Sequence, residues 1–314
     1  MGAIAWQFPG QGSQFVGMGQ DLVGAFPEAA DIFRAADDIL GFPLSRLCFE
    51  GPEADLTDTI NAQPAIFVHS AAVLAVLRHR GNGMLPAFVA GHSLGEYSAL
   101  YAAGALEFAD ALRLVRERGR LMKLAGERQP GGMAAVLGLD LDTVRDICER
   151  ARAETSSPVQ VANDNCPGQV VISGALPGLE RAMTLAQSAG ARKVVRLAVS
   201  IAAHSPLMQV VQDEFAAAVR ATPMRAPQVP VVMNATARPT TDVTEIRERL
   251  VAQLTSPVRW TDSVRFMRDQ GVDTLMEIGP GDVLTKLARR IDRGLQRITL
   301  GSAESLRAYL NGTL

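Results

Sequence analysis

The 314-residue chain has little cysteine: Cys48, Cys148 and Cys166 are odd in number and far apart, and no CxxC pair occurs. This spacing excludes a disulfide framework and offers no ligand set for a zinc site. We therefore expect no metal and a reducing, cytoplasmic compartment. The first residues carry no basic segment ahead of the first apolar run, so the sequence predicts no secretory signal peptide.

The chain also lacks an excess of charge and lacks long apolar runs. Its formal net charge is −2, so the basic surface that binds nucleic acid is not expected. No uninterrupted apolar run reaches the roughly 18 residues of a membrane span, so no membrane partner is expected either. The composition, 47% hydrophobic and 20% charged, is that of a globular protein with one large domain, alone or carrying a smaller one.

Three short apolar runs, at residues 3–8, 87–90 and 274–278, each end in a glycine-rich turn that leads into a helical pattern. Strands followed by such turns and helices predict an α/β domain with a mainly parallel sheet. Parallel sheets carry their ligand sites at the C-terminal ends of the strands. We therefore expect all three turns at one edge of the sheet.

The middle of the chain has a different order of patterns. It predicts strands at residues 133–137, 159–162, 169–173 and 193–199, and helices at 142–153 and 179–188. This is the β-α-β-β-α-β order of a ferredoxin-like unit. We therefore predict an inserted small subdomain at residues 128–198 and a large α/β domain formed by residues 1–127 and 199–314.

Residues 91–95 read Gly-His-Ser-Leu-Gly and fit the G-x-S-x-G pattern of a nucleophile elbow. They follow an apolar strand pattern and precede a helix expected at residues 96–106, which is the strand–turn–helix setting of such an elbow. The turn would present the Ser93 hydroxyl above the sheet, and the amide of Leu94 can stabilise an oxyanion. The alternative is a glycine turn that exposes a serine with no chemical role.

A serine hydroxyl needs a base, and the chain has four histidines. His79 lies in a basic stretch and His69 in a helical pattern, so we expect both to be structural. His92 adjoins the serine and is expected to support the site rather than to act as the base. His204 is the preferred base, because it follows a strand predicted to end near Val199 and precedes an expected helix start.

Residues 108–125 have the spacing of an amphipathic helix, and Arg118 is the only charge within its apolar face. Burying a guanidinium is unfavourable without an anion. One interpretation is a structural ion pair, or a side chain that reaches solvent from the edge of the face. The other is a guanidinium that binds a substrate carboxylate through two hydrogen bonds.

Four segments together resemble the malonyl-CoA:acyl carrier protein transacylase family, whose free-standing members serve fatty acid or polyketide synthesis. They are FPGQGSQ at residues 8–14, GHSLGEYSAL at 91–100, NCPGQVVISG at 165–174 and EIGPG at 277–281. They lie in the family's order and span nearly the whole chain. The resemblance implies an α/β-hydrolase-like large catalytic domain with a mainly parallel sheet plus an inserted ferredoxin-like small subdomain.

The resemblance also implies roles for matching residues. The catalytic pair would be Ser93, which is acylated, and His204, which is the base. The positions that support this pair would be the oxyanion-hole amides of Gln11 and Leu94, the substrate-binding residues Arg118, Gln11 and His92, and Gln253, whose backbone carbonyl orients the histidine.

The implied reaction moves malonyl from coenzyme A to the phosphopantetheine thiol of a carrier protein through a malonyl-serine, in a ping-pong cycle. The partners would be malonyl-CoA and an acyl carrier protein, with no cofactor beyond these thioester substrates, and we expect a monomer. An acidic carrier needs a basic surface. The candidates for this surface are Arg192, Lys193, Arg289 and Arg290.

The segment Ile201-Ala202-Ala203-His204 departs from the family's patterns, because related polyketide acyltransferases carry His-Ala-Phe-His or Tyr-Ala-Ser-His there. Ala203 leaves room beside the acyl α-carbon, so a branched malonyl group is an alternative, although malonyl is favoured. Other interpretations are a trans-acting polyketide acyltransferase and the malonyl-loading subunit of malonate decarboxylase. The remaining alternatives are a lipase- or thioesterase-like hydrolase and a carrier-binding pseudoenzyme.

Overall fold

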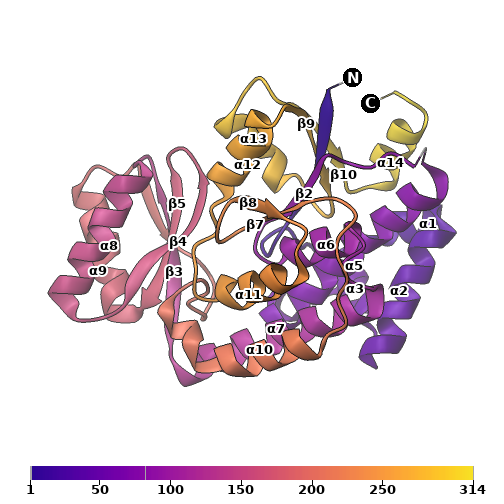
Figure 1. Ribbon diagram of the computed structural model, residues 1–314. Helices are drawn as coiled ribbons and strands as arrows, with labels where there is room; N and C mark the ends of the chain where they lie inside the picture. Colours follow the sequence, from indigo (N-terminus) through magenta and orange to yellow (C-terminus); the bar gives the residue numbers. More distant parts are fainter. Residues whose placement is uncertain (1, 82, 314) are drawn as a thin grey trace.

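The computed structural model describes residues 2–81 and 83–313, which form two sheets with helices packed around them (Figure 1). The larger sheet has the strand order β10-β9-β1-β2-β7-β8. Its neighbouring strands are parallel except at one end, where β8 runs antiparallel to β7. These strands are β1 (Ala3–Phe8), β2 (Phe88–Gly91), β7 (Val231–Met233), β8 (Arg238–Thr240), β9 (Val272–Ile278) and β10 (Gln296–Leu300).

The helices that accompany the larger sheet come from both ends of the chain. The N-terminal set is α1 (Gln20–Ala25), α2 (Pro27–Leu40), α3 (Leu44–Glu50), α4 (Glu53–Thr57), α5 (Thr59–Arg80), α6 (Gly95–Ala102) and α7 (Phe108–Arg128). The C-terminal set is the 3₁₀ helix η1 (Pro206–Val211), α10 (Gln212–Ala221), α11 (Val243–Gln253), α12 (Trp260–Asp269), α13 (Val283–Ile291) and α14 (Ala303–Leu310).

The smaller sheet comes from one continuous stretch of chain in the order β-α-β-β-α-β. Its strands pair antiparallel in the order β4-β5-β3-β6. Helices α8 and α9 cover the side of this sheet that faces away from the larger sheet (Figure 1). The elements are β3 (Gly131–Leu137), α8 (Leu141–Thr155), β4 (Val159–Cys166), β5 (Gln169–Ala175), α9 (Leu176–Ser188) and β6 (Lys193–Arg196).

These two sheets confirm the predicted α/β fold, with a mainly parallel sheet and a separate antiparallel one. The predicted glycine turns also meet, because β1 lies between β2 and β9 and runs parallel to both. Their C-terminal ends therefore share one edge. The division into domains at residues 128 and 198 stays a prediction.

Two predicted elements end earlier than expected. The strand predicted at 193–199 ends at Arg196, because Leu197 makes the last hydrogen bond to β3, at the Met133 carbonyl, before the chain turns away. The helix predicted at 96–106 ends at Ala102, because Gly104 takes a left-handed conformation (φ 75°) that an α-helix does not accommodate.

Helix α5 is the core helix of the large part of the molecule. By length and composition alone it could cross a membrane, and it is the one such helix among residues 2–81 and 83–313. However, 83% of its most apolar stretch is buried within the fold. Its hydropathy is therefore that of a helix packed on several sides by the same chain.

Candidate active site

The Ser93 turn joins β2 to α6, and its backbone leaves no room for larger flanking residues. A Cβ on Gly91 would lie 1.9 Å from the carbonyl atoms of Gly95, and one on Gly95 would lie 2.1 Å from the Phe8 carbonyl oxygen. Ser93 itself has a positive φ of 52°. A non-glycine residue in this conformation is strained, and such strain persists where the surrounding structure enforces it.

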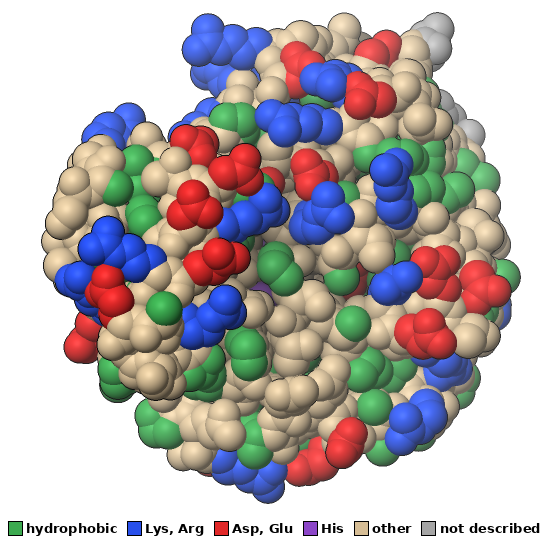
Figure 2. All heavy atoms as spheres, turned by 60° about the vertical axis from the view of Figure 1, so that its left-hand side comes forward, with side chains coloured by type: hydrophobic (Ala, Val, Ile, Leu, Met, Phe, Trp, Pro, Cys, Tyr) green, Lys and Arg blue, Asp and Glu red, His purple; other side chains and the backbone are tan. Residues whose placement is uncertain are grey.

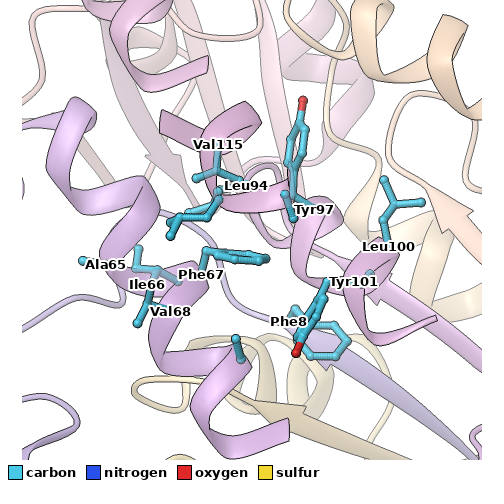
Figure 3. Close-up of a cluster of buried hydrophobic side chains, with 14 of the residues drawn as sticks. Phe8, Ala65, Ile66, Phe67, Val68, Leu94, Tyr97, Leu100, Tyr101 and Val115 are labelled. Atoms are coloured by element: carbon cyan, nitrogen blue, oxygen red, sulfur yellow. The ribbon is translucent and has the colours of Figure 1, made fainter. Parts of the chain in front are cut away.

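The core beneath the elbow holds it in place. Leu94, Tyr97 and Leu100, from the elbow and α6, lie in the buried cluster with Phe67 of α5 and Val115 of α7 (Figure 3). All five side chains are at most 2% exposed. The helix that starts at the elbow is therefore anchored by packing on two long helices, and its N-terminal end cannot shift without opening this core.

His204 meets the serine from the other side of the cavity. Its Nε2 lies 2.8 Å from Ser93 Oγ, and its Nδ1 lies 2.8 Å from the Gln253 carbonyl oxygen. A carbonyl oxygen only accepts, so Nδ1 carries the proton and Nε2 is free to accept one from the hydroxyl. Ser205, the next residue, caps η1 by accepting a hydrogen bond from Leu207, as the sequence predicted for a helix start here.

The surroundings keep His204 neutral. Burial and the positive charge of Arg118 lower the pKa of His204 to about 3, and His92 acts in the same direction. The carbonyl oxygens of Gln253 and Ser256 act in the opposite direction but do not compensate. A neutral imidazole is the form that a general base requires.

Arg118 is buried, at 1% exposure, although it is a cation on the apolar face of α7. Its NH1 donates to Gln63 Oε1 at 2.7 Å, and its NH2 donates to Gln253 Oε1 at 2.9 Å and to Ser93 Oγ at 3.0 Å. These partners are two amides and a hydroxyl rather than a carboxylate. Arg118 is therefore neither in a side-chain ion pair nor extended to solvent, and its guanidinium lies beside Ser93 Oγ.

The predicted oxyanion-hole residues line the same cavity. Gln11 and Leu94 both border the space around Ser93. Within residues 2–81 and 83–313, no hydrogen bond uses the backbone N–H of either residue. Two unpaired backbone donors beside a serine are what a developing oxyanion needs. The side chain of Gln11 is fixed separately, because its Oε1 accepts from Thr59 Oγ1 at 2.9 Å.

The other three histidines lie in different surroundings. His92 is half-buried next to Ser93, where its Nε2 donates to Asn165 Oδ1 at 2.8 Å and its ring packs edge-on against Trp260. Burial lowers the pKa of His92, so it is also neutral. His79 is exposed and lies 3.4 Å from Glu28, whereas His69 is buried within α5.

The cavity over Ser93 has a volume of about 300 Å³. It opens in the hollow between the parts that carry the two sheets, where a histidine is visible in Figure 2. Besides the residues above, its wall includes Met122, Met133, Val199, Ile201 and Ala203. The apolar wall faces the polar group of Ser93, His204 and Arg118, as in a typical small-molecule site.

Four polar residues of the site were given no role from the sequence. Gln63 belongs to the apolar α5, Glu96 to the first turn of α6, Asn165 to β4, and Asn234 to the turn after β7. Asn234 Oδ1 accepts from the Ser93 backbone N–H at 2.7 Å, and its Nδ2 donates to the Gly91 carbonyl at 2.6 Å. A polar residue within the apolar α5 is the one signal that could have drawn attention to Gln63.

Comparison with known proteins agrees with this geometry. The acyl transferase domain model matches residues 5–304. The chain belongs to the acyl transferase domain family. It is 44% identical over 306 residues to the malonyl CoA-acyl carrier protein transacylase of Bacillus subtilis, covering 98% of this chain and 96% of the relative. It is 43% identical over 311 residues to the enzyme of that name from Escherichia coli K12, with 99% of each chain covered.

Solved structures of this acyl transferase family have the same fold. The acyl carrier protein S-malonyltransferase of Vibrio cholerae superposes with a TM-score of 0.93 at 41% identity, covering 98% of this chain and 99% of the other. A malonyl-transacylase solved in complex with a type II polyketide acyl-carrier protein gives a TM-score of 0.95 at 41% identity, with 99% of each chain covered. The chain is therefore an acyltransferase, and the resemblance stated from four segments is confirmed.

Proposed function

We propose that the chain is a malonyl-CoA:acyl carrier protein S-malonyltransferase with a Ser93–His204 dyad. The observation that carries this proposal is the position of Ser93 Oγ, 2.8 Å from the base His204 and 3.0 Å from the buried cation Arg118 in one cavity. The first contact provides a nucleophile and the second an anion site beside it. Relatives named for this activity, covered over nearly their whole length, support it.

In the first half of the cycle, His204 Nε2 takes the hydroxyl proton while Ser93 Oγ attacks the malonyl thioester carbon. The carbonyl electrons move onto oxygen, and the backbone amides of Gln11 and Leu94 stabilise this oxyanion. When the carbonyl re-forms, the carbon–sulfur bond breaks and coenzyme A leaves as a thiol with the proton from His204. The product of this half is malonyl-Ser93.

In the second half, His204 takes the proton of the phosphopantetheine thiol, and the thiolate attacks the malonyl-serine ester. The carbon–oxygen bond of the ester then breaks, and the proton returns to Ser93 Oγ. Gln253 orients His204 through its backbone carbonyl in both halves. The dyad needs no third carboxylate in contact with the histidine, which suits a reactive thioester.

Arg118 selects the acyl group in this mechanism. Its guanidinium binds the free carboxylate of malonyl, while Gln11 and His92 complete the substrate site. An acyl group that lacks the carboxylate leaves the buried cation without an anion, so acetyl is a poor substrate. Ala203 leaves space for a branch on the α-carbon, yet unbranched malonyl is the proposed substrate.

The carrier protein is proposed to dock on a basic surface beside the small sheet. Arg192, Lys193, Arg289 and Arg290 are all exposed. Arg192 and Arg290 lie beside Gly138 and Gly168, which are in turns at the ends of strands of that sheet. Charge of this sign attracts an acidic partner and speeds its association.

The remaining features of the proposal follow from this chemistry. The serine, the histidine and the arginine supply the nucleophile, the base and the anion site, so the reaction needs no cofactor and no metal. We further propose that the large domain is α/β-hydrolase-like and that the enzyme is a cytoplasmic monomer without nucleic-acid or membrane partners. Its malonyl-loaded carrier would serve fatty acid or polyketide synthesis.

The deciding experiment compares transfer with hydrolysis. The protein is incubated with malonyl-CoA, with and without a carrier protein bearing phosphopantetheine, and Ser93, the carrier and free malonate are followed by mass spectrometry. We expect one malonyl group on Ser93 and its movement to the carrier. Ser93→Ala is the control and should remain unlabelled. Malonate released at the same rate without carrier would instead identify a hydrolase.

A further inference from the structure

Glu96 is a fully buried carboxylate behind the elbow that the mechanism above does not use. It is 0% exposed, in the first turn of α6. Its Oε1 accepts from the Asn234 backbone N–H at 2.6 Å, and its Oε2 accepts from Gln253 Nε2 at 2.5 Å. A buried carboxylate is costly to the fold unless its hydrogen bonds are made. Its two partners therefore indicate what it does.

Both partners of Glu96 in turn hold the reacting residues. Gln253 accepts from Arg118 through its side chain and from His204 through its backbone carbonyl, and its Nε2 also donates to the Ser93 carbonyl at 3.0 Å. Asn234 accepts from the Ser93 backbone N–H. Glu96 is thus connected to Ser93, His204 and Arg118 through one intervening residue in each case.

We propose that Glu96 is a positioning residue that fixes the Gln253 side chain and the Ser93 turn, and through them the alignment of His204 and Arg118. This inference rests on the proposed transfer reaction. In a Ser-His-Asp triad a carboxylate contacts the histidine directly. Here Gln253 lies between the carboxyl group of Glu96 and His204.

The donor and acceptor pattern of Gln253 shows why a carboxylate is needed. An amide has one accepting end and one donating end. Arg118 can only donate, so it requires the Gln253 oxygen, and the Gln253 nitrogen must then find acceptors on the other side. Glu96 supplies one of them. If residue 96 offered a donor there, the amide would turn or shift, and Arg118 would lose its acceptor.

The charges are consistent with this arrangement. Arg118 contacts only neutral groups directly, and its charge favours the ionised form of Glu96 on the far side of Gln253. Burial raises the pKa of Glu96 to about 8, although the hydrogen bonds from Asn234 and Gln253 and the charge of Arg118 act in the opposite direction. Both carboxyl oxygens accept N–H hydrogen bonds, and these contacts fix the Gln253 side chain.

The test measures the single-turnover rate of Ser93 acylation by malonyl-CoA in a double-mutant cycle of Glu96→Gln and Gln253→Met. Methionine keeps the length of the side chain and the backbone carbonyl at 253 but removes the amide. Each single variant should acylate about tenfold to hundredfold more slowly, as expected for misaligned reacting groups. The double variant should be no more than about twofold slower than the slower single variant, because both changes break the same connection.

The outcomes separate this inference from the proposed function. If the unaltered protein is not malonylated on Ser93, the proposed function fails. If it is malonylated and the two losses multiply, Glu96 acts independently of Gln253 and the inference is overturned. Glu96→Gln should also lower the ratio of malonyl to acetyl acylation rates through Arg118. A purely structural role would lower both rates equally, so an unchanged ratio overturns the inference as well.

Glu277→Gln is the matched control. Glu277 is another fully buried glutamate, and it accepts hydrogen bonds from the backbone N–H groups of Leu284 and Thr285 at the start of α13. This variant loses a buried carboxylate away from the dyad and should keep the acylation rate within about twofold. If Glu96→Gln does not fold, Gln253→Met is the test on its own. An acylation rate and a malonyl-to-acetyl rate ratio equal to those of the unaltered protein would then overturn the inference.

Discussion

Arg118 is a buried residue placed to act on both the proposed nucleophile and the proposed substrate. Its NH2 donates to Ser93 Oγ, while two glutamines hold the rest of the guanidinium. The cation therefore lies where both the attacking oxygen and a substrate carboxylate can reach it. Both glutamines are neutral, so a substrate carboxylate can add an opposite charge in direct contact with the guanidinium.

Arg118→Ala is expected to change which acyl group is transferred. The variant loses charge-assisted hydrogen bonds to the malonyl carboxylate, each of which contributes about 1.5–3 kcal/mol. Malonyl acylation should fall at least tenfold to hundredfold, and by a larger factor than acetyl acylation, which does not use the carboxylate contact. Initial rates with malonyl-CoA and acetyl-CoA measure this directly. A variant that keeps its preference for malonyl would disprove the carboxylate role.

The pH dependence follows from His204. Its pKa of about 3 lies below the ordinary value of 6.5, so the base stays neutral at mildly acidic pH. Acylation measured as kcat/KM should therefore stay nearly constant from pH 8 to about 5.5. In Arg118→Ala the charge that helps to lower this pKa is gone, so the acid limb should move to higher pH. A wild-type profile that falls near pH 6.5 would contradict this prediction.

The same shift affects stability, with a defined sign. Because the pKa of His204 is lower in the folded chain, the unfolded chain binds more protons as the pH falls from 6.5 towards 3. The contribution of neutral His204 to stability is therefore present above pH 6.5 and is lost on acidification.

At the scale of elements, the β2–α6 turn depends on its glycines for space. Gly95→Ala would place a methyl group against the Phe8 carbonyl and should destabilise the fold by about 1–3 kcal/mol, with loss of acylation. Gly24→Ala is the control, because no atom within 4 Å meets its new Cβ in α1 and alanine favours helix by about 0.5–1 kcal/mol. Denaturant titration measures both. Equal stability of the two variants would refute the packing argument.

The elements that the sequence predicted are those with a strong local pattern. β1 was predicted with its observed bounds because an apolar run ends there in a glycine turn. The Ser93 elbow was predicted because its glycine turn joins a strand pattern to a helix pattern. Arg118 was singled out because it interrupts a regular apolar face. β7 has only three residues, too few for a period, and was not predicted. Its neighbour Asn234 was missed for the same reason.

Other side-chain roles could not be found because they depend on which segments meet. Glu96, Gln253 and Asn234 come from α6, α11 and the turn after β7, and each is an ordinary polar residue in its own segment. Gln253 was assigned through a family resemblance and only for its backbone carbonyl. The side-chain connection between Glu96 and Arg118 becomes visible only in three dimensions.

At the scale of the whole molecule, the small sheet contributes residues to the proposed active site. Gln160 of β4 donates to the carbonyl oxygens of His204 and Thr255, and Asn165 of β4 accepts from His92. Asn163 forms a β-bridge to Val258 of the large part. His204 and the elbow are therefore both tied to the small sheet, whose strand β6 begins at Lys193 of the proposed carrier surface.

This placement makes carrier docking testable separately from acylation. Reversing charge with Arg192→Glu and Arg289→Glu should raise the KM for the carrier about fivefold or more and weaken its salt dependence, because exposed charges act mainly on association. Acylation by malonyl-CoA should remain unchanged. Arg34→Glu on α2 is the control, since it is exposed and its helix packs against α1, α3, α5 and α7 rather than the small sheet. An unaltered carrier KM in the double variant would place the docking surface elsewhere.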